Sequence, residues 1–186
     1  MSRAEAKARS LRLMGFDIDG VMTDGRLYFS PAGDELKAFF TRDGLGLKLL
    51  ARAGVRLAII TGRSSEIVAR RAENLGIDLV IQGVEDKRAA MASLLARERL
   101  SFAEAGFMGD DIVDLALMAA CGFAATVPDG HPLVRRSADY VTTAAAGAGA
   151  VREVCEFILQ AQDKWQSALA DYLPADSAHP AQAGGK

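Results

Sequence analysis

Met14-Gly-Phe-Asp-Ile-Asp-Gly-Val-Met-Thr-Asp-Gly25 is the segment around which the rest of this chain is arranged. Residues 11–16 form a short apolar run of buried-strand length, which ends abruptly at Asp17 and Asp19 and is followed by Gly20. Two residues apart on an extended chain, both carboxylates point the same way, and each raises the pKa of the other unless a cation lies between them. Mg²⁺ is the natural cation for such oxygen ligands. A solvated acidic turn is the simpler explanation of an isolated Asp-x-Asp, so the assignment depends on motifs further along the chain.

Length and composition indicate one globular domain. The chain has 186 residues and a mass of 19.7 kDa, and half of its residues are hydrophobic while a quarter are charged. We expect a single domain over residues 1–173, with a hairpin insert at about 26–40. The small and polar residues 174–186 are expected to form a disordered tail.

Charge and targeting signals exclude several partners. The net charge of −2 gives no electrostatic reason to expect nucleic acid or an anionic membrane as a partner. The charged N-terminus lacks the apolar core of a signal peptide, and no apolar run approaches the ~20 residues that span a bilayer. Cys121 and Cys155 lie in apolar helical patterns, and two cysteines make neither a disulfide framework nor a metal site. A cytoplasmic protein is expected.

Alternating strand and helix patterns follow the acidic segment. Strands are expected at 55–60, 78–82, 106–109 and 123–127, and helices at 45–54, 64–76, 85–100, 110–121 and 151–159. Ser64 is the expected N-cap of the second helix, residues 144–150 are expected to be a flexible loop, and the helix over 151–159 is expected to be the last ordered element. This order predicts an α/β fold: a three-layer, Rossmann-like, mostly parallel sheet flanked by helices.

The expected hairpin carries apolar residues on both of its faces. Its strands alternate around the turn Ser30-Pro-Ala-Gly-Asp34. Its large apolar residues are Leu27, Phe29, Leu36, Phe39 and Phe40. A hairpin exposing so much apolar surface is expected to be covered by another surface.

Candidate functional residues follow directly after three expected strands. Asp17, Thr61 and Asp110 all stand at strand ends, and in parallel sheets ligands bind beyond the carboxyl ends of the strands. Thr61 and the helix that follows it can hold an anion. Lys87 is either a phosphate ligand or a solvated lysine beside acidic neighbours, and Asp110 is either a metal ligand or a charge at a helix N-terminus. Together the residues predict a cation site beside an anion site, as phosphoryl transfer requires.

These motifs resemble those of the haloacid dehalogenase superfamily. They are Asp17-Ile-Asp-Gly-Val-Met-Thr-Asp24, Thr61-Gly-Arg63, Lys87 and Gly109-Asp-Asp-Ile-Val-Asp114. The resemblance covers residues 12–160 and implies a magnesium-dependent phosphatase. Neither the interval from Gly20 to Thr61 nor that from Thr61 to Lys87 has room for a separate cap domain. A capless enzyme accepts large substrates or borrows a lid from a neighbouring subunit, so we expect an oligomer.

The resemblance also implies a role for each motif residue. Asp17 would attack phosphorus and form an aspartyl-phosphate, and Asp19 would act as the general acid and base. The carboxylates of Asp17 and Asp110 and the backbone carbonyl of Asp19 would hold Mg²⁺. Thr61 and Lys87 would grip the phosphoryl oxygens. Asp111 and Asp114 would orient the shell around the metal.

More closely, the chain resembles the family of 3-deoxy-D-manno-octulosonate 8-phosphate phosphatases. The similarity rests on Phe40-Thr-Arg-Asp-Gly-Leu-Gly46, Thr61-Gly-Arg-Ser-Ser65 and Gly149-Ala-Val-Arg-Glu-Val-Cys155. It implies a homotetramer joined by its hairpins and a sugar acid phosphate substrate in lipopolysaccharide precursor synthesis. The implied substrate contacts are Asp19, Phe40, Thr41, Arg42, Asp43, Gly44, Arg63, Arg71 and Lys87.

One position departs from the pattern of that family. The chain has Ala148 where relatives usually carry an arginine just before the last helix. Loss of this arginine is expected to weaken substrate binding or to alter specificity. Arg71 also has a simpler interpretation, as a solvated helix residue.

Three other functions compete with this prediction. A nine-carbon sugar acid 9-phosphate is the alternative substrate within the phosphatases. A phospho-acceptor receiver module, which is a signalling domain, also places acidic residues, Thr and Lys at strand ends. In such modules, however, the phospho-acceptor follows a middle strand, whereas here the candidate nucleophile is in the first acidic pair. Dinucleotide binding is disfavoured, because Gly44-Leu-Gly46 lacks the full glycine fingerprint.

Overall fold

The computed structural model describes residues 1–173, and its centre is one sheet of parallel strands. The strands are β1 (Leu13–Phe16), β4 (Arg56–Ile60), β5 (Leu79–Ile81), β6 (Ala105–Met108), β7 (Phe123–Thr126) and β8 (Tyr140–Val141). Their order across the sheet is β5-β4-β1-β6-β7-β8, and every neighbouring pair is parallel. The tail that the sequence predicts at 174–186 lies outside the described residues.

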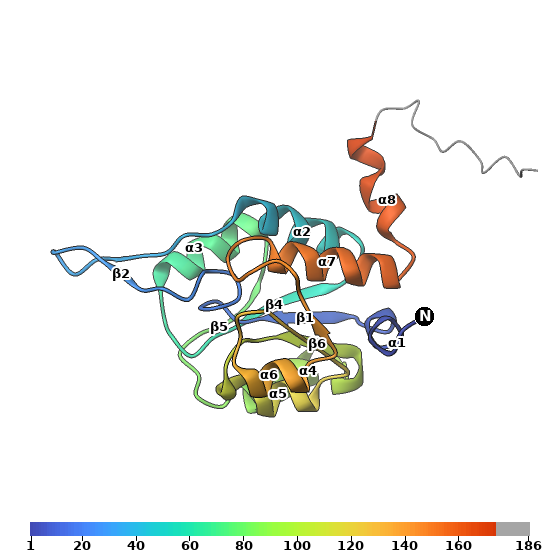
Figure 1. Cartoon of the computed structure of the whole chain (residues 1–186), viewed down its shortest axis with the longest axis horizontal. Helices are drawn as coiled ribbons and strands as arrows, with labels where there is room; N and C mark the ends of the chain where they lie inside the picture. Colours follow the sequence, from blue (N-terminus) through green and yellow to red (C-terminus); the bar gives the residue numbers. More distant parts are fainter. Residues whose placement is uncertain (174–186) are drawn as a thin grey trace, which may run out of the picture.

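Helices cover both faces of this sheet and make the expected three layers (Figure 1). One layer holds α2 (Thr41–Arg52), α3 (Glu66–Leu75) and α7 (Ala150–Ala161), and the other holds α4 (Lys87–Glu98), α5 (Leu115–Ala120) and α6 (Pro132–Ser137). The remaining helices are α1 (Arg3–Arg9), α8 (Trp165–Leu169) and the 3₁₀ turns η1 (Phe102–Glu104), η2 (Ile112–Asp114) and η3 (Ala170–Tyr172). The α/β prediction is confirmed. None of the helices that the structure describes is long and apolar enough to cross a membrane.

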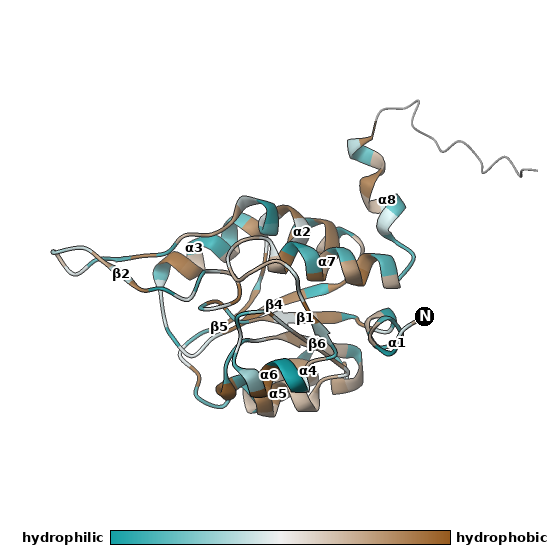
Figure 2. Ribbon diagram, viewed as in Figure 1, coloured by the Kyte–Doolittle hydropathy of each residue, from teal (hydrophilic) through white to brown (hydrophobic). Residues whose placement is uncertain are grey.

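The central strand β1 is buried along its whole length. Met14 and Phe16 pack into the core on the α2 and α7 side, whereas Leu13 packs into the core on the α4 side. Gly15 allows the layers to approach, because a Cβ there would lie 2.9 Å from the Phe107 ring. Figure 2 shows β1 in brown and white between two layers of helices that carry teal segments. The buried β1 therefore fixes where the acidic segment leaves the sheet.

Between β1 and β4 the chain forms only the antiparallel hairpin of β2 (Tyr28–Phe29) and β3 (Glu35–Leu36) and then α2. The hairpin projects away from the body (Figure 1), and Phe29 and Leu36 are 62% and 60% exposed. Between β4 and β5 lies α3 alone. The hairpin and the capless architecture are confirmed.

Three details of the sequence prediction are wrong. Ser65, not Ser64, is the N-cap of α3, and its backbone N–H donates to the Gln82 side chain at 2.8 Å. Residues 144–150 are not a loose loop, because Ala146 is buried and the Gly147 N–H donates to the Val21 carbonyl. The last ordered element is not α7, since α8 and η3 follow it.

The five-residue α8 is little more than one helical turn, which is too short to show a helical period in the sequence. It is held instead by tertiary contacts. The Lys164 ammonium donates to the Ala53 carbonyl at 2.8 Å, and Trp165 packs against the core. Contacts of this kind leave no pattern in a short stretch of sequence.

Candidate active site

The carboxyl ends of β1, β4 and β6 open into one cleft of about 510 Å³. The chain proceeds to β4 and β5 on one side of β1 and to β6, β7 and β8 on the other, so β1 lies at the switch point where such sheets bind ligands. The predicted residues that line this cleft are Asp17, Asp19, Thr61, Arg63, Lys87, Asp110 and Asp111.

Lys87 lies between two buried carboxylates at the base of the cleft. Its ammonium donates at 2.6 Å to Asp17 Oδ2 and at 2.6 Å to Asp114 Oδ1. Lys87 is only 4% exposed, so it is not the solvated lysine of the simpler interpretation. Burial alone would lower the pKa of Lys87, but the carboxylates of Asp17 and Asp114 raise it above its ordinary value. The lysine is therefore a fixed positive charge beside the candidate nucleophile.

Asp17 leaves the end of β1 with its carboxylate held on both oxygens. Oδ1 accepts the Ile18 N–H at 2.7 Å, while Oδ2 accepts the Lys87 ammonium. Burial raises the pKa of Asp17, Lys87 opposes this shift, and the nearby Asp114 charge adds to it. A carboxylate oriented in this way at a cleft floor is suited to attack an electrophile.

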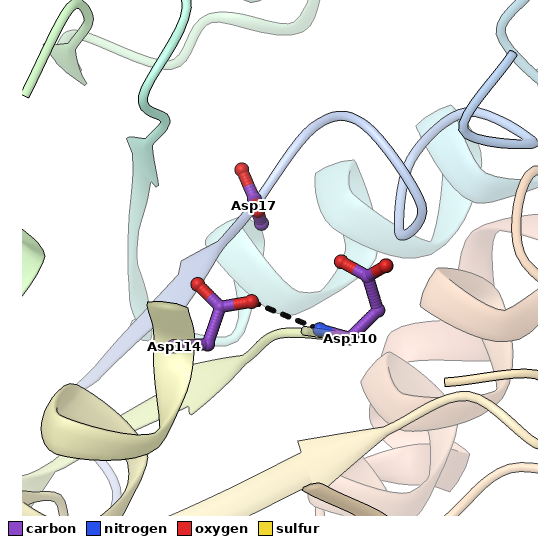
Figure 3. Close-up of side chains that lie close together, drawn as sticks. All are labelled: Asp17, Asp110 and Asp114. Carbon is purple, nitrogen blue, oxygen red and sulfur yellow. Dashed lines mark hydrogen bonds between the residues drawn. The ribbon is translucent and has the colours of Figure 1, made fainter. Parts of the chain in front are cut away.

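Asp110 brings a further negative charge to the same point. Asp17, Asp110 and Asp114 each offer an oxygen within 4.8 Å of the others (Figure 3). Burial, together with the charges of Asp114, Asp17 and Asp111, raises the pKa of Asp110 to about 7. This excess of oxygen ligands and negative charge fits a hard divalent cation such as Mg²⁺.

Asp114 is buried behind the cluster and does not line the cleft. Its Oδ2 accepts the backbone N–H groups of Asp110 at 3.0 Å and Asp111 at 3.2 Å, and its Oδ1 accepts Lys87. Figure 3 shows the first of these bonds as a dashed line. Since Asp114 is fully buried and both of its oxygens are engaged, it can orient the loop that carries Asp110.

Gly20, which has no side chain, lets the segment after β1 approach the Asp110 carboxylate. A Cβ at Gly20 would lie 2.1 Å from Asp110 Oδ2, and Gly20 also has a φ of +86°. Both the close approach and the left-handed backbone require glycine.

Thr61 and Arg63 complete the cleft from the β4 side. Thr61 is 3% exposed, and its backbone N–H donates to the Ile81 carbonyl at 3.0 Å. Arg63 is about half exposed, and its Nε lies 3.7 Å from Asp19 Oδ2. A guanidinium here is available to a carboxylate or phosphate in the cleft.

The remaining predicted contacts lie outside the cleft lining, around the start of α2, where Arg71 of α3 packs beside them. They are Phe40, Thr41, Arg42, Asp43, Gly44 and Arg71. Thr41 and Arg42 are exposed, whereas Asp43 is 2% exposed and its Oδ1 accepts the Arg152 N–H in the first turn of α7 at 2.8 Å. Arg71 lies against Gly44 and over the Phe39 ring, at 5.5 Å from its centroid.

The sequence did not single out two charged hairpin residues that contact the cleft lining. Lys37 contacts the Asp19 carboxylate, and Glu35 contacts Lys37 at 3.1 Å and Arg63 at 3.2 Å. In sequence they are the polar positions of an alternating strand. Only their spacing, with two opposite charges on one side of the strand, could have drawn attention to them.

The comparisons with known proteins agree with this geometry, although no family model matches the chain. The 3-deoxy-D-manno-octulosonate 8-phosphate phosphatase KdsC of Yersinia pestis is 44% identical over 162 residues, which are 87% of each chain. The KdsC phosphatase of Escherichia coli K12 is 42% identical over 163 residues, covering 88% of this chain and 87% of that protein.

A crystal structure of the Moraxella catarrhalis 3-deoxy-D-manno-octulosonate 8-phosphate phosphatase, in complex with magnesium, phosphate and KDO, aligns with a TM-score of 0.91. It is 42% identical, and the alignment covers 93% of this chain and 99% of that one. On this similarity of sequence and fold, the chain belongs to the 3-deoxy-D-manno-octulosonate 8-phosphate phosphatase family, in the capless subfamily of the haloacid dehalogenase superfamily.

Proposed function

We propose that this protein is a magnesium-dependent phosphatase that hydrolyses 3-deoxy-D-manno-octulosonate 8-phosphate to the free sugar acid and phosphate. The observation that carries the proposal is the meeting of Asp17, Lys87 and Asp110 in one cleft at the end of β1. The choice of substrate rests on the family to which the chain belongs. Its relatives are named for this activity.

In the first half of the reaction, the Asp17 carboxylate attacks phosphorus. The bond from phosphorus to the sugar oxygen breaks, and Asp19 gives its proton to that oxygen. In the second half, Asp19 takes a proton from water, which attacks the phosphorus of the aspartyl-phosphate. Inorganic phosphate leaves, and Asp17 is regenerated as a carboxylate.

Other residues hold the phosphoryl group while its bonds change. Lys87 and Thr61 bind its oxygens, because both line the cleft close to Asp17. The carboxylates of Asp17 and Asp110 and the carbonyl of Asp19 would hold Mg²⁺, with Asp111 and Asp114 orienting the loop beside it. Bound Mg²⁺ neutralises the charge of the carboxylates and of the phosphoryl oxygens.

The substrate's sugar acid is bound further out. Arg63 lines the cleft and offers a bidentate guanidinium to the sugar carboxylate. Arg71 and residues 40–44 stand beyond the cleft of a single chain, and they would contact substrate once the assembly completes the site. Because the exposed Ala148 stands where the family pattern has an arginine, that outer region would have one cation fewer than the pattern implies.

A phosphate-release panel tests the proposed function. The panel compares the eight-carbon sugar acid 8-phosphate, a nine-carbon sugar acid 9-phosphate and 4-nitrophenyl phosphate, each with Mg²⁺ and with a chelator. We expect the eight-carbon substrate to have the highest kcat/KM. Activity should disappear in chelator and return with Mg²⁺, because the acidic cluster repels itself without a cation. Full activity in chelator would rule out the metal site, and preference for the nine-carbon ester would reassign the substrate.

The exposed hairpin supports self-association, with a homotetramer as the proposed state. On the two short strands, and at Leu27 directly before the first, four large apolar residues are between 42% and 62% exposed: Leu27, Tyr28, Phe29 and Leu36. Burying a side chain of this size contributes roughly 1.5–3 kcal/mol, so several together favour a permanent interface. Such an interface would also cover the unpaired strand edges.

Charge on the hairpin is expected to break this assembly. Phe29→Glu and Leu36→Glu should each dissociate the oligomer in sedimentation velocity. They should also lower kcat/KM for the sugar acid phosphate roughly tenfold or more, equivalent to ~1.4 kcal/mol, while 4-nitrophenyl phosphate is little affected. Leu133→Glu is the matched control, since Leu133 is an apolar residue 45% exposed on α6. A wild-type monomer with full activity on the sugar phosphate would contradict the proposed assembly.

We place the protein in the cytoplasm. Both cysteines, Cys121 and Cys155, are free and buried, which fits a reducing compartment.

A further inference from the structure

A lysine beside the hairpin strand β3 contacts Asp19, the candidate general acid and base, which lines the cleft. Lys37 follows β3, and its ammonium donates to Asp19 Oδ1. The same ammonium lies 3.1 Å from Glu35 Oε1. The contact joins two segments that are otherwise separated by the whole hairpin.

Burial makes Lys37 the more rigid of the two cations around Asp19. The Lys37 side chain is 1% exposed, whereas that of Arg63 is 47% exposed. A buried ammonium is costly unless it is paired, so Lys37 needs both of its carboxylates. The Arg63 contact with Asp19 is longer, at 3.7 Å, and lies closer to solvent, where an ion pair contributes little.

The cluster is balanced in charge. Asp19 and Glu35 supply two negative charges, and Lys37 and Arg63 supply two positive charges. Glu35 therefore has a role of its own, because it contacts both cations and ties them to β3. Lys37 is held at one end by the hairpin and at the other by Asp19.

We propose that Lys37 is a positioning residue for the reaction: it holds the Asp19 carboxyl group at the cleft mouth, where that group exchanges a proton with the leaving oxygen and then with water. The inference rests on the proposed phosphatase function. The alternative is that Lys37 only fastens the base of the hairpin to the body. The two roles differ in how the rate depends on the leaving group.

The test uses Lys37→Met and a series of substituted phenyl phosphates whose leaving groups differ in pKa but hardly in size. Because these substrates are all small, loss of the hairpin assembly affects them equally. General acid catalysis matters most for poor leaving groups, and it contributes on the order of 10²–10⁴ in rate. We expect Lys37→Met to lower kcat by about 10- to 100-fold for the poorest leaving groups, but little for 4-nitrophenyl phosphate. KM should change little, since Lys37 does not hold the phosphoryl group.

A double-mutant cycle with Asp19→Asn separates positioning from anchoring. If Lys37 acts through Asp19, Lys37→Met should cause no further loss in the Asp19→Asn background. Additive losses, or an equal loss for every leaving group, would overturn the inference. Lys48→Met is the control, because Lys48 is an exposed lysine on α2.

Two further measurements keep the outcomes distinct. If Lys37→Met does not fold, as judged by urea unfolding, Lys37→Gln replaces it. The loss in that variant must likewise depend on the leaving group and disappear in the Asp19→Asn background. Lys37→Arg keeps the charge and is expected to restore part of the loss. A wild-type protein that releases no phosphate refutes the proposed function itself. An active wild type whose Asp19→Asn variant becomes sensitive to the leaving group, while the Lys37 variants do not, refutes only this inference.

Discussion

Asp17→Asn is expected to abolish turnover and covalent trapping of phosphate together. An asparagine keeps the shape of the side chain and can still accept the Ile18 N–H, but it has no nucleophilic carboxylate. Removing a covalent nucleophile costs roughly 10⁶-fold in kcat where it has been measured in other enzymes. The measurements are steady-state phosphate release and detection of the aspartyl-phosphate by mass after acid quenching.

Asp171→Asn serves as the control, since Asp171 is an exposed aspartate in η3, on a different part of the chain. It should retain wild-type kcat and the trapped intermediate. Near-normal turnover by Asp17→Asn would refute the covalent mechanism. Loss of turnover with the intermediate still formed would instead place the nucleophile on another residue.

Lys87→Met is expected to damage both stability and activity. It would leave Asp17 and Asp114 as buried carboxylates without the cation that each contacts at 2.6 Å. Removing one partner of a buried ion pair typically costs 3–5 kcal/mol, and we expect about that loss in the free energy of unfolding by urea. Activity should fall as well, because Lys87 binds the transferring phosphoryl group.

Magnesium provides an internal check on this explanation. A divalent cation restores positive charge to the carboxylate cluster, so Mg²⁺ should stabilise Lys87→Met more than it stabilises the wild type. The exposed-lysine variant Lys48→Met should change the free energy of unfolding by less than about 0.5 kcal/mol. A Lys87→Met variant as stable as this control would show that the paired charges do not hold the cleft floor together.

The sequence was sufficient to predict the sheet and the residues at its carboxyl edge. Buried parallel strands are short apolar runs, and the rule that ligands bind beyond their carboxyl ends brought Asp17, Thr61 and Asp110 together. The burial of the Lys87 side chain was not predictable, because a lysine beside Glu85 and Asp86 has the same sequence pattern whether it is solvated or buried.

Contacts between distant segments were the part that the sequence did not reveal. Lys37 looks like any polar residue of an alternating strand, and only the path of the hairpin brings it to Asp19. Asp43 was predicted as a substrate contact, but nothing local indicates that its carboxylate would also hold the first turn of α7. Such pairings depend on tertiary geometry rather than on periodicity or turn chemistry.

The absence of a Cβ at Gly20 makes the positions of two parts of the site depend on each other. Any larger residue at position 20 would displace the Asp110 carboxylate and would also strain a backbone at φ +86°. The distance between the segment that carries Asp17 and the segment that carries Asp110 is therefore fixed by this close contact. Variation in substrate preference must then arise at the rim, through the hairpin, Arg63 and the neighbourhood of Ala148, while the reacting centre stays the same.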